Sequence, residues 1–226
     1  MAGESQPQSV ANLTRRLLSP DEETADRGLL EAMKTRATAK AGEFKPQEVS
    51  NLFWALATMR EKADRGLLDA MQRQATVTAG EFIPQAVANL LWALATMGER
   101  ADRGLLQAMQ SQATVTAEDF NSQAVANVLW ALAVMGEKPD RELLEVMQKR
   151  ATATAEEFNP QAVSNLLWAL ATMGERADRG LLEAMQTRAT GTAVKFNPQD
   201  VANVLWALAT MGERADLELL EAMLRR

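Results

Sequence analysis

The sequence predicts an all-α fold: a right-handed α-solenoid (superhelix) of antiparallel helix pairs, about six units long, with a repeat of 38 residues. All the tryptophans follow this step, at Trp54, Trp92, Trp130, Trp168 and Trp206. A phenylalanine ladder follows it too, at Phe44, Phe82, Phe120, Phe158 and Phe196. Every methionine except Met1 falls on one of two further ladders with the same step. Units of this length stack on one another because none buries its apolar face alone.

Residue types mark where each helix begins and ends, as the unit at residues 158–195 illustrates. Asn159 is a good N-cap and a proline follows it, so the first helix of the pair (helix A) is expected to run from there to a left-handed C-cap at Gly174. Asp178 caps the second helix (helix B), which has a single apolar stripe. The connecting segment Thr154–Glu157 has a capping-box pattern and predicts one extra helical turn.

The two helices of a unit differ in how much of their surface is apolar. Helix A is apolar nearly all round, so we expect it to be sandwiched between layers, with its tryptophan in the core and its methionine filling gaps. Helix B carries the charges and is expected to face solvent. The polar exceptions on helix A, Gln161, Asn165 and Thr172, share one face with Trp168 and repeat through the stack as parallel columns.

The units are expected to form one continuous domain. Residues 1–43 are predicted to be a degenerate N-terminal capping repeat, because Arg15 and Arg16 bring charge to the place of the Trp-Ala pair in later units. The helix-pair repeats that follow are predicted at residues 44–81, 82–119, 120–157, 158–195 and, truncated, 196–226. Leu217 and Leu224 stand where other units have Arg or Gln, which predicts an apolar C-terminal end. That end would join further repeats of a longer array or self-associate with another copy.

Composition argues against most chemistry. The 226 residues include no Cys and no His, so thiolate nucleophiles, the commonest transition-metal ligand and the usual general base are missing. Gly66, Gly104 and Gly180 stand alone and form no phosphate-binding loop. We therefore predict no enzyme activity, no cofactor and no metal site. The net charge of −6 provides no general attraction to nucleic acid or anionic membrane. No apolar run approaches the roughly 20 residues of a membrane span, and no targeting peptide is visible.

Two sets of side chains are candidates for binding. The first, the amide column, places a glutamine and an asparagine on each helix A: Gln47 and Asn51, Gln85 and Asn89, Gln123 and Asn127, Gln161 and Asn165, Gln199 and Asn203. The second, the basic track, lies at the C-terminal end of helix B: Arg73, Lys149, Arg150 and Arg188. The repeat at residues 82–119 leaves a gap in this track, with Ser111 and Gln112 at the corresponding positions. Readers of single-stranded nucleic acid use amides at base edges and basic groups along the backbone.

Each set also has a structural interpretation. The asparagines could form a ladder in which each amide bonds to the backbone of the next repeat. The basic side chains could complement the helix dipole. Because an asparagine that selects a base should vary unless the target is a homopolymer, the variable positions nearby are alternative candidates for specificity. These are Lys45, Ile83, Asn121, Asn159 and Asn197, and Glu48, Ala86, Ala124, Ala162 and Asp200.

The string FNPQAVSNLLWALATMG, from Phe158 to Gly174, and its copies resemble the octotricopeptide repeat (OPR) family of organellar proteins. Similar strings precede RAP domains in FAST-kinase-like proteins. The resemblance covers nearly the whole chain from Pro7 onward. It implies an α-solenoid that binds single-stranded RNA in the chloroplast or mitochondrion, where it would act in RNA processing, stability or translation.

Two hypotheses therefore stand. The first is an OPR-like RNA-binding array, which the resemblance and the amide column favour and the acidic net charge opposes. The second is a protein-interaction scaffold, adaptor or effector, which near-identical acidic repeats and an apolar C-terminal end favour. A continuous positive groove along the amide column would favour RNA, and an acidic or filled groove would favour protein.

Overall fold

A computed structural model describes residues 20–224, and within that range the chain forms eleven α-helices and no strand. The predicted all-α solenoid is confirmed. The A helices are α3 (Pro46–Met59), α5 (Pro84–Met97), α7 (Ser122–Met135), α9 (Pro160–Met173) and α11 (Pro198–Met211). The B helices are α2 (Pro20–Ala39), α4 (Arg65–Val77), α6 (Arg103–Val115), α8 (Arg141–Ala153), α10 (Arg179–Gly191) and α12 (Leu217–Leu224). The predicted N-terminal capping substitution, Arg15 and Arg16, lies outside the described residues.

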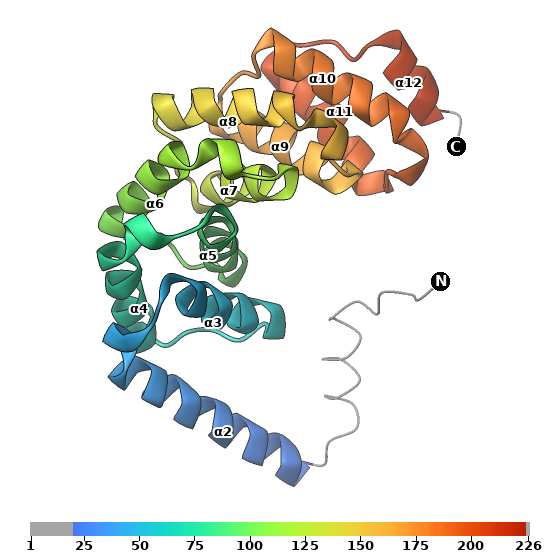
Figure 1. Cartoon of the computed structure of the whole chain (residues 1–226). Helices are drawn as coiled ribbons and strands as arrows, with labels where there is room; N and C mark the ends of the chain where they lie inside the picture. The colour runs from blue at the N-terminus through green and yellow to red at the C-terminus, as the bar shows by residue number, and fades with distance from the viewer. Residues whose placement is uncertain (1–19, 225–226) are drawn as a thin grey trace.

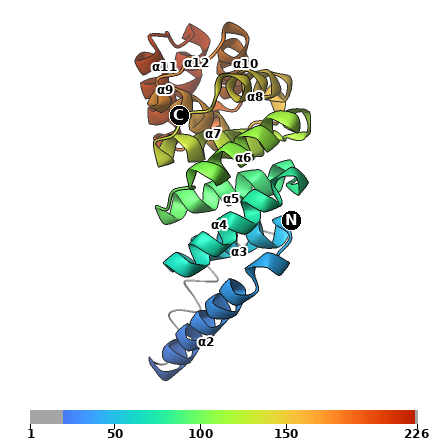
Figure 2. The ribbon, with the colours of Figure 1, turned by 90° about the vertical axis from the view of Figure 1, so that its left-hand side faces the viewer.

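The helices form two layers along a curved array. In Figure 1 the A helices α3, α5 and α7 lie towards the inside of the arc, and α4 and α6 form its outer edge. Figure 2 shows the outer B helices stacked one above another. Successive A helices pack against each other far more extensively than successive B helices do. The concave layer is therefore a continuous row of packed helices, and the convex layer is more open.

The predicted helix ends are confirmed in their atomic detail. The Oδ1 atom of Asn159 accepts a hydrogen bond from the N–H of Ala162 at 2.8 Å, and Asp178 caps α10 through the N–H of Leu181 at 2.8 Å. Gly174 ends α9 in the left-handed region, with φ of 71°. Local capping rules thus fix the length of each helix and, through it, the repeat.

The turn before each helix A is a 3-10 helix. These turns are η1 (Ala41–Glu43), η2 (Ala79–Glu81), η3 (Ala117–Asp119), η4 (Ala155–Glu157) and η5 (Ala193–Lys195). The extra turn was predicted, but the capping box was wrong. The hydroxyl of Thr154 donates to the carbonyl of Arg150 at 2.9 Å, so it serves the C-terminus of the preceding helix and does not cap the turn.

One C-cap departs from the pattern. Arg60 ends α3 with φ of 59°, where the four later A helices use glycine at 71° to 77°. The Arg60→Gly substitution is expected to raise the free energy of unfolding by about 1 kcal/mol, because a Cβ is unfavourable in this conformation. Urea denaturation measures the change. Gly136→Ala is the matched control, with an expected loss of about 1 kcal/mol. Equal stability of Arg60→Gly and the parent, with a destabilised control, would contradict the prediction.

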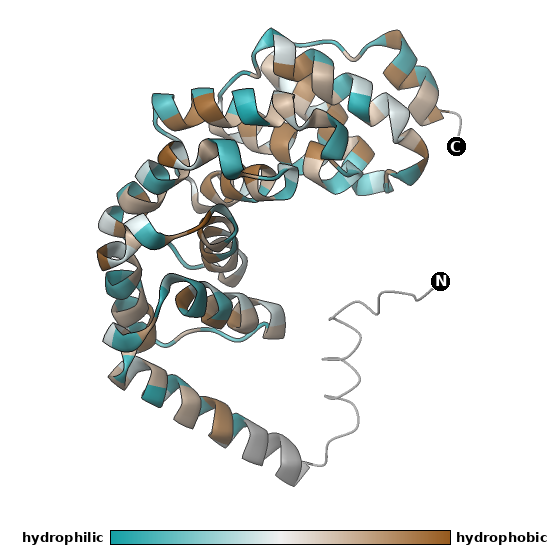
Figure 3. Ribbon diagram, in the orientation of Figure 1, coloured by the Kyte–Doolittle hydropathy of each residue, from teal (hydrophilic) through white to brown (hydrophobic). Residues whose placement is uncertain are grey.

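The core lies between the two layers. Phe82, Phe120, Phe158 and Phe196 are almost fully buried, as are leucines such as Leu91 and Leu129. Apolar and polar residues alternate along the helices in Figure 3, and many of the polar ones lie in the connecting turns. Among the described helices, none combines the length and apolar character that a bilayer span requires.

Hydrogen bonds from the B helices hold successive repeats in register. The Oε1 atom of a glutamine on one B helix accepts from the N–H of the aspartate that caps the next B helix, at 2.6 to 2.8 Å. The pairs are Gln72 with Asp102, Gln110 with Asp140, Gln148 with Asp178, and Gln186 with Asp216. Because these glutamines are buried and bonded in the same way at each junction, we call them the glutamine ladder.

The C-terminal end exposes apolar side chains. Leu217 is 70% exposed and Leu224 is 81% exposed. Leu205 is also partly exposed, whereas its counterparts Leu167 and Leu129 are fully buried beneath the next helix A. Self-association through this face stays a prediction.

Candidate nucleic-acid interface

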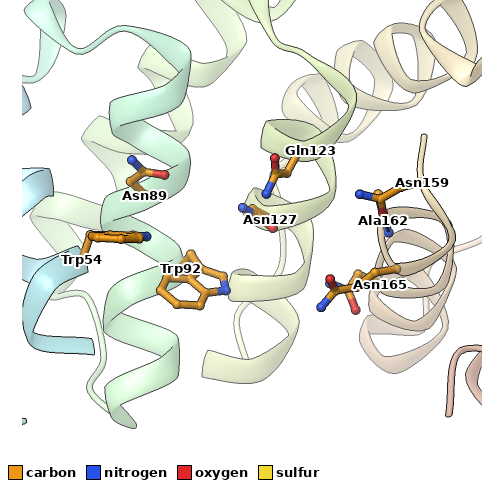
Figure 4. Close-up of a pocket in the computed structure, with 9 residues that line it drawn as sticks. Trp54, Asn89, Trp92, Gln123, Asn127, Asn159, Ala162 and Asn165 are labelled. Carbon is orange, nitrogen blue, oxygen red and sulfur yellow. Dashed lines mark hydrogen bonds between the residues drawn. The ribbon is translucent and has the colours of Figure 1, made fainter. Parts of the chain in front are cut away.

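The amide column lies on the concave face. Gln123, Asn127, Gln161 and Asn165 line one hollow of about 210 Å³, which Trp54, Asn89 and Trp92 complete. Figure 4 shows the side chains of Trp54, Asn89, Trp92, Asn127 and Asn165 projecting from successive A helices. Four repeats, through α3, α5, α7 and α9, therefore contribute to one site. The remaining members of the column, Gln47, Asn51, Gln85, Gln199 and Asn203, occupy the same positions on their helices.

Two of the amide pairs are joined by hydrogen bonds within their helix. The Nε2 atom of Gln47 donates to Oδ1 of Asn51 at 3.0 Å, and Gln85 donates to Asn89 at 2.8 Å. Within the described residues, no asparagine of the column bonds to the backbone of the next repeat. The structural-ladder interpretation of the asparagines is therefore wrong, because the glutamine ladder of the B helices makes those bonds instead.

The tryptophans belong to this face too, so their assignment to the core holds only in part. Trp54 is 41% exposed and Trp206 is 47% exposed, while Trp92, Trp130 and Trp168 are half-buried with part of each ring packed on the core. The reason is helical geometry: each tryptophan follows an asparagine by three residues and so shares its face. Helix A is accordingly not sandwiched. One of its faces packs on the core and another lines the groove.

The basic track does not join the amide column. Arg150 and Arg188 each donate from Nε to a phenylalanine carbonyl 30 residues earlier at 2.6 Å, to Phe120 and Phe158 respectively. Two repeats have a glutamine at this position, and it makes the same bond: Gln74 to Phe44 at 2.8 Å and Gln112 to Phe82 at 2.7 Å. These arginines are thus structural, and the apparent gap in the track is filled by an equivalent donor.

The other two members of the track are exposed. Arg73 and Lys149 lie near the C-terminal ends of α4 and α8, at the edge of the solenoid where helix B leads into helix A. None of the four basic residues lines the amide hollow. Arg188 lines a separate hollow of about 700 Å³ between α8, η4 and α10.

A third set of candidate residues, which was not predicted from the sequence, consists of basic side chains. In the turn from helix A to helix B, each repeat carries a lysine or arginine with the 38-residue step: Lys62, Arg100, Lys138, Arg176 and Arg214. We call this set the cation rim. The Arg100 guanidinium lies beside Gly136 of the next repeat, and the Lys138 ammonium lies beside Gly174. The fixed step was the signal that could have revealed it.

Electrostatically, the groove floor is neutral. Helices α5, α7 and α9 contain no charged residue. A glutamate precedes each rim cation, and Lys138 pairs with Glu175 at 3.3 Å. The groove is therefore neither strongly positive nor acidic, and its floor favours uncharged ring faces and base edges over phosphate.

On the B helices, arginines pair with acids one turn later. Arg141 donates to Glu145, and Arg179 to Glu183, both at 2.8 Å. The hydrogen bond, and then the charge of the glutamate, raises the pKa of each arginine above its ordinary value. Both pairs are exposed, so they contribute little to stability.

Fold and site together define the class: a helical-repeat protein whose concave face carries a hollow lined by amides and tryptophans. The model of the RNA-editing substrate-binding complex 6 protein family matches residues 26–225. The chain belongs to this family, which connects it to RNA processing in general. A comparison with curated proteins found no match.

Proposed function

We propose that the chain binds single-stranded RNA along its concave face and acts in RNA processing. The observation that carries the proposal is the shared hollow, where two tryptophans and amides of neighbouring repeats converge. Aromatic platforms stack bases, and amides bond base edges. In keeping with a sequence that lacks cysteine and histidine, the proposed role is binding and not catalysis.

Two further observations support this proposal. The family name refers to a complex that binds RNA-editing substrates. The repeats also resemble those of OPR proteins, and on that resemblance we propose an organellar role, in the mitochondrion or chloroplast, in RNA processing, stability or translation.

The test is binding of the purified chain to a pool of random single-stranded RNA at low and moderate salt. Salt-sensitive binding is expected, because some affinity must come from phosphate contacts. An absence of binding even at low salt would overturn the proposal. It would favour a protein scaffold instead, in line with the net charge of −6.

The cation rim is proposed to hold the RNA backbone. Replacing Lys62, Arg100, Lys138 and Arg176 with alanine is expected to flatten the dependence of log K on log salt by roughly 0.7 for each phosphate that is no longer neutralised. Binding should weaken to a similar extent for all sequences, because phosphate contacts carry no sequence information. Fluorescence anisotropy across a salt series measures both effects.

The matched control removes the same charge from the opposite edge of the solenoid. It replaces Arg36, Arg73, Lys149 and Lys195, which are exposed at or beyond the C-terminal ends of B helices. The control is expected to keep the parent's slope. If the salt slope flattens in the control and stays unchanged in the rim variant, the RNA backbone lies along the edge that carries Arg73 and Lys149.

A further inference from the structure

The same pair of reading side chains recurs in every repeat. Each helix A from α3 to α11 carries a glutamine at its second residue and an asparagine four residues later. In modular single-strand readers, two or three side chains of each repeat contact one base. Identical readers select identical bases, whereas a mixed target needs readers that differ.

The geometry of the readers recurs as well as their identity. The glutamine ladder makes the same bond at every junction it spans, with lengths between 2.6 and 2.8 Å. Three successive A helices, α7, α9 and α11, have the same asparagine N-cap, and every helix A has 14 residues. Each repeat therefore carries its amides at equivalent backbone positions, although among the described pairs only those on α3 and α5 are bonded within their helix.

Each amide pair can offer a donor next to an acceptor. Where Gln85 donates to Asn89, one lone pair of the Asn89 oxygen is used, and the asparagine NH₂ and the glutamine oxygen stay available. In the hollow, Asn127 and Asn165 have no hydrogen-bond partner within the described protein, so their whole amides face the groove. A donor beside an acceptor is the pattern that an amide uses against a base edge.

Most of the variable positions beside the amides are buried or bonded within the protein, whereas Lys45 and Ile83 are exposed. Ala86, Ala124 and Ala162 are buried. As N-caps, Asn121, Asn159 and Asn197 each accept a hydrogen bond from a backbone N–H group with the side-chain oxygen. At the ends of the array, Glu48 accepts from the N–H of Lys45 at 2.9 Å, and Asp200 is buried. The amide pairs, which recur on every helix A, are therefore the stronger candidates for base selection.

We infer that the groove selects a uniform tract, a run of one nucleotide type read by successive repeats. This inference rests on the proposed binding of single-stranded RNA and adds the substrate class. Tryptophan stacking accepts any base, so the selection falls to the amide pairs.

The experiment compares labelled 12-mers by fluorescence anisotropy: a homopolymer of each of the four nucleotides, and a mixed sequence of balanced composition. One homopolymer is expected to bind at least tenfold more tightly than the mixed sequence. A mixed sequence that binds as tightly as every homopolymer would overturn the uniform tract and leave RNA binding standing. Failure of the parent to bind any of these RNAs or the random pool would overturn RNA binding itself.

A variant tests the residues. Replacing Gln123, Asn127, Gln161 and Asn165 with alanine is expected to bring the homopolymer and the mixed sequence within about threefold of each other, with residual binding through the tryptophans. Gln107→Ala with Ser111→Ala is the control, since both side chains are exposed on the B helix α6 and line neither hollow. A preference retained in the amide variant would overturn the assignment. The comparison of homopolymer and mixed RNA is made on the parent chain, so it tests the uniform tract even if the variant does not fold.

Discussion

Replacing Trp92, Trp130 and Trp168 together with leucine is expected to weaken RNA binding at least about 100-fold. Base–aromatic stacking contributes about 1–3 kcal/mol per base, so three missing platforms remove at least about 3 kcal/mol, at tenfold for each 1.4 kcal/mol. Leucine keeps an apolar group against the core on which these half-buried rings pack. Equilibrium titration with the random RNA pool, next to the parent chain, measures the loss.

A control separates stacking from general loss of apolar surface. Val77, Val115 and Val194 are exposed and lie outside the hollow. Their replacement with alanine should leave affinity unchanged. Both proteins should keep the helical circular dichroism of the parent. Affinity of the tryptophan variant within threefold of the parent would show that the rings are structural only.

The second large effect is on stability, and it separates the two kinds of amide in the chain. Gln148→Ala is expected to lower the free energy of unfolding by about 1–3 kcal/mol, because the N–H of Asp178 loses the acceptor that the buried glutamine provides. Asn127→Ala is expected to change it by less than about 0.5 kcal/mol, because Asn127 has no hydrogen-bond partner within the described residues. Urea denaturation of the two variants and the parent gives both values.

This comparison has its own contradictory outcome. If Asn127→Ala costs as much as Gln148→Ala, the asparagine is structural after all and the amide column loses its role as a reader. If neither variant is destabilised, the glutamine ladder does not hold the repeats together.

The helix boundaries could be predicted from sequence because their causes are local. An asparagine or aspartate with its N–H partner three residues away defines most starts, and Gly174 and its counterparts define the ends. Thr154 shows the limit of such rules. Its hydroxyl could cap the turn that follows or bond to the helix that precedes it, and it donates to the carbonyl of Arg150.

The roles of the basic residues could not be predicted, because they depend on partners 30 residues away. Arg150 and Gln112 look unrelated in charge, yet both place an N–H on a phenylalanine carbonyl. Only the packed structure shows that the two types are interchangeable here. The cation rim differs from the basic track, because its members are already related in the sequence by the 38-residue step. Their position along one edge of the solenoid is seen only in the structure.

The tryptophans were misplaced for a different reason. In a helix that is apolar nearly all round, composition does not reveal which apolar residues face the groove. The polar residues do, since Gln161 and Asn165 mark that face and Trp168 shares it. The face was predicted correctly, and the error was to assign its aromatic member wholly to the core.

The unequal packing of the two layers has a mechanical consequence. The A helices are in close mutual contact, while the B helices meet mainly through sparse bonds such as that from Asp178 to Gln148 at 2.7 Å. When the array bends, the spacing between the closely packed A helices changes little. The B helices of the outer layer move apart or closer together instead. An RNA bound as proposed along the A helices would keep the spacing of its contacts while the outer layer opens or closes. A change in the curvature of the solenoid would then cost little affinity.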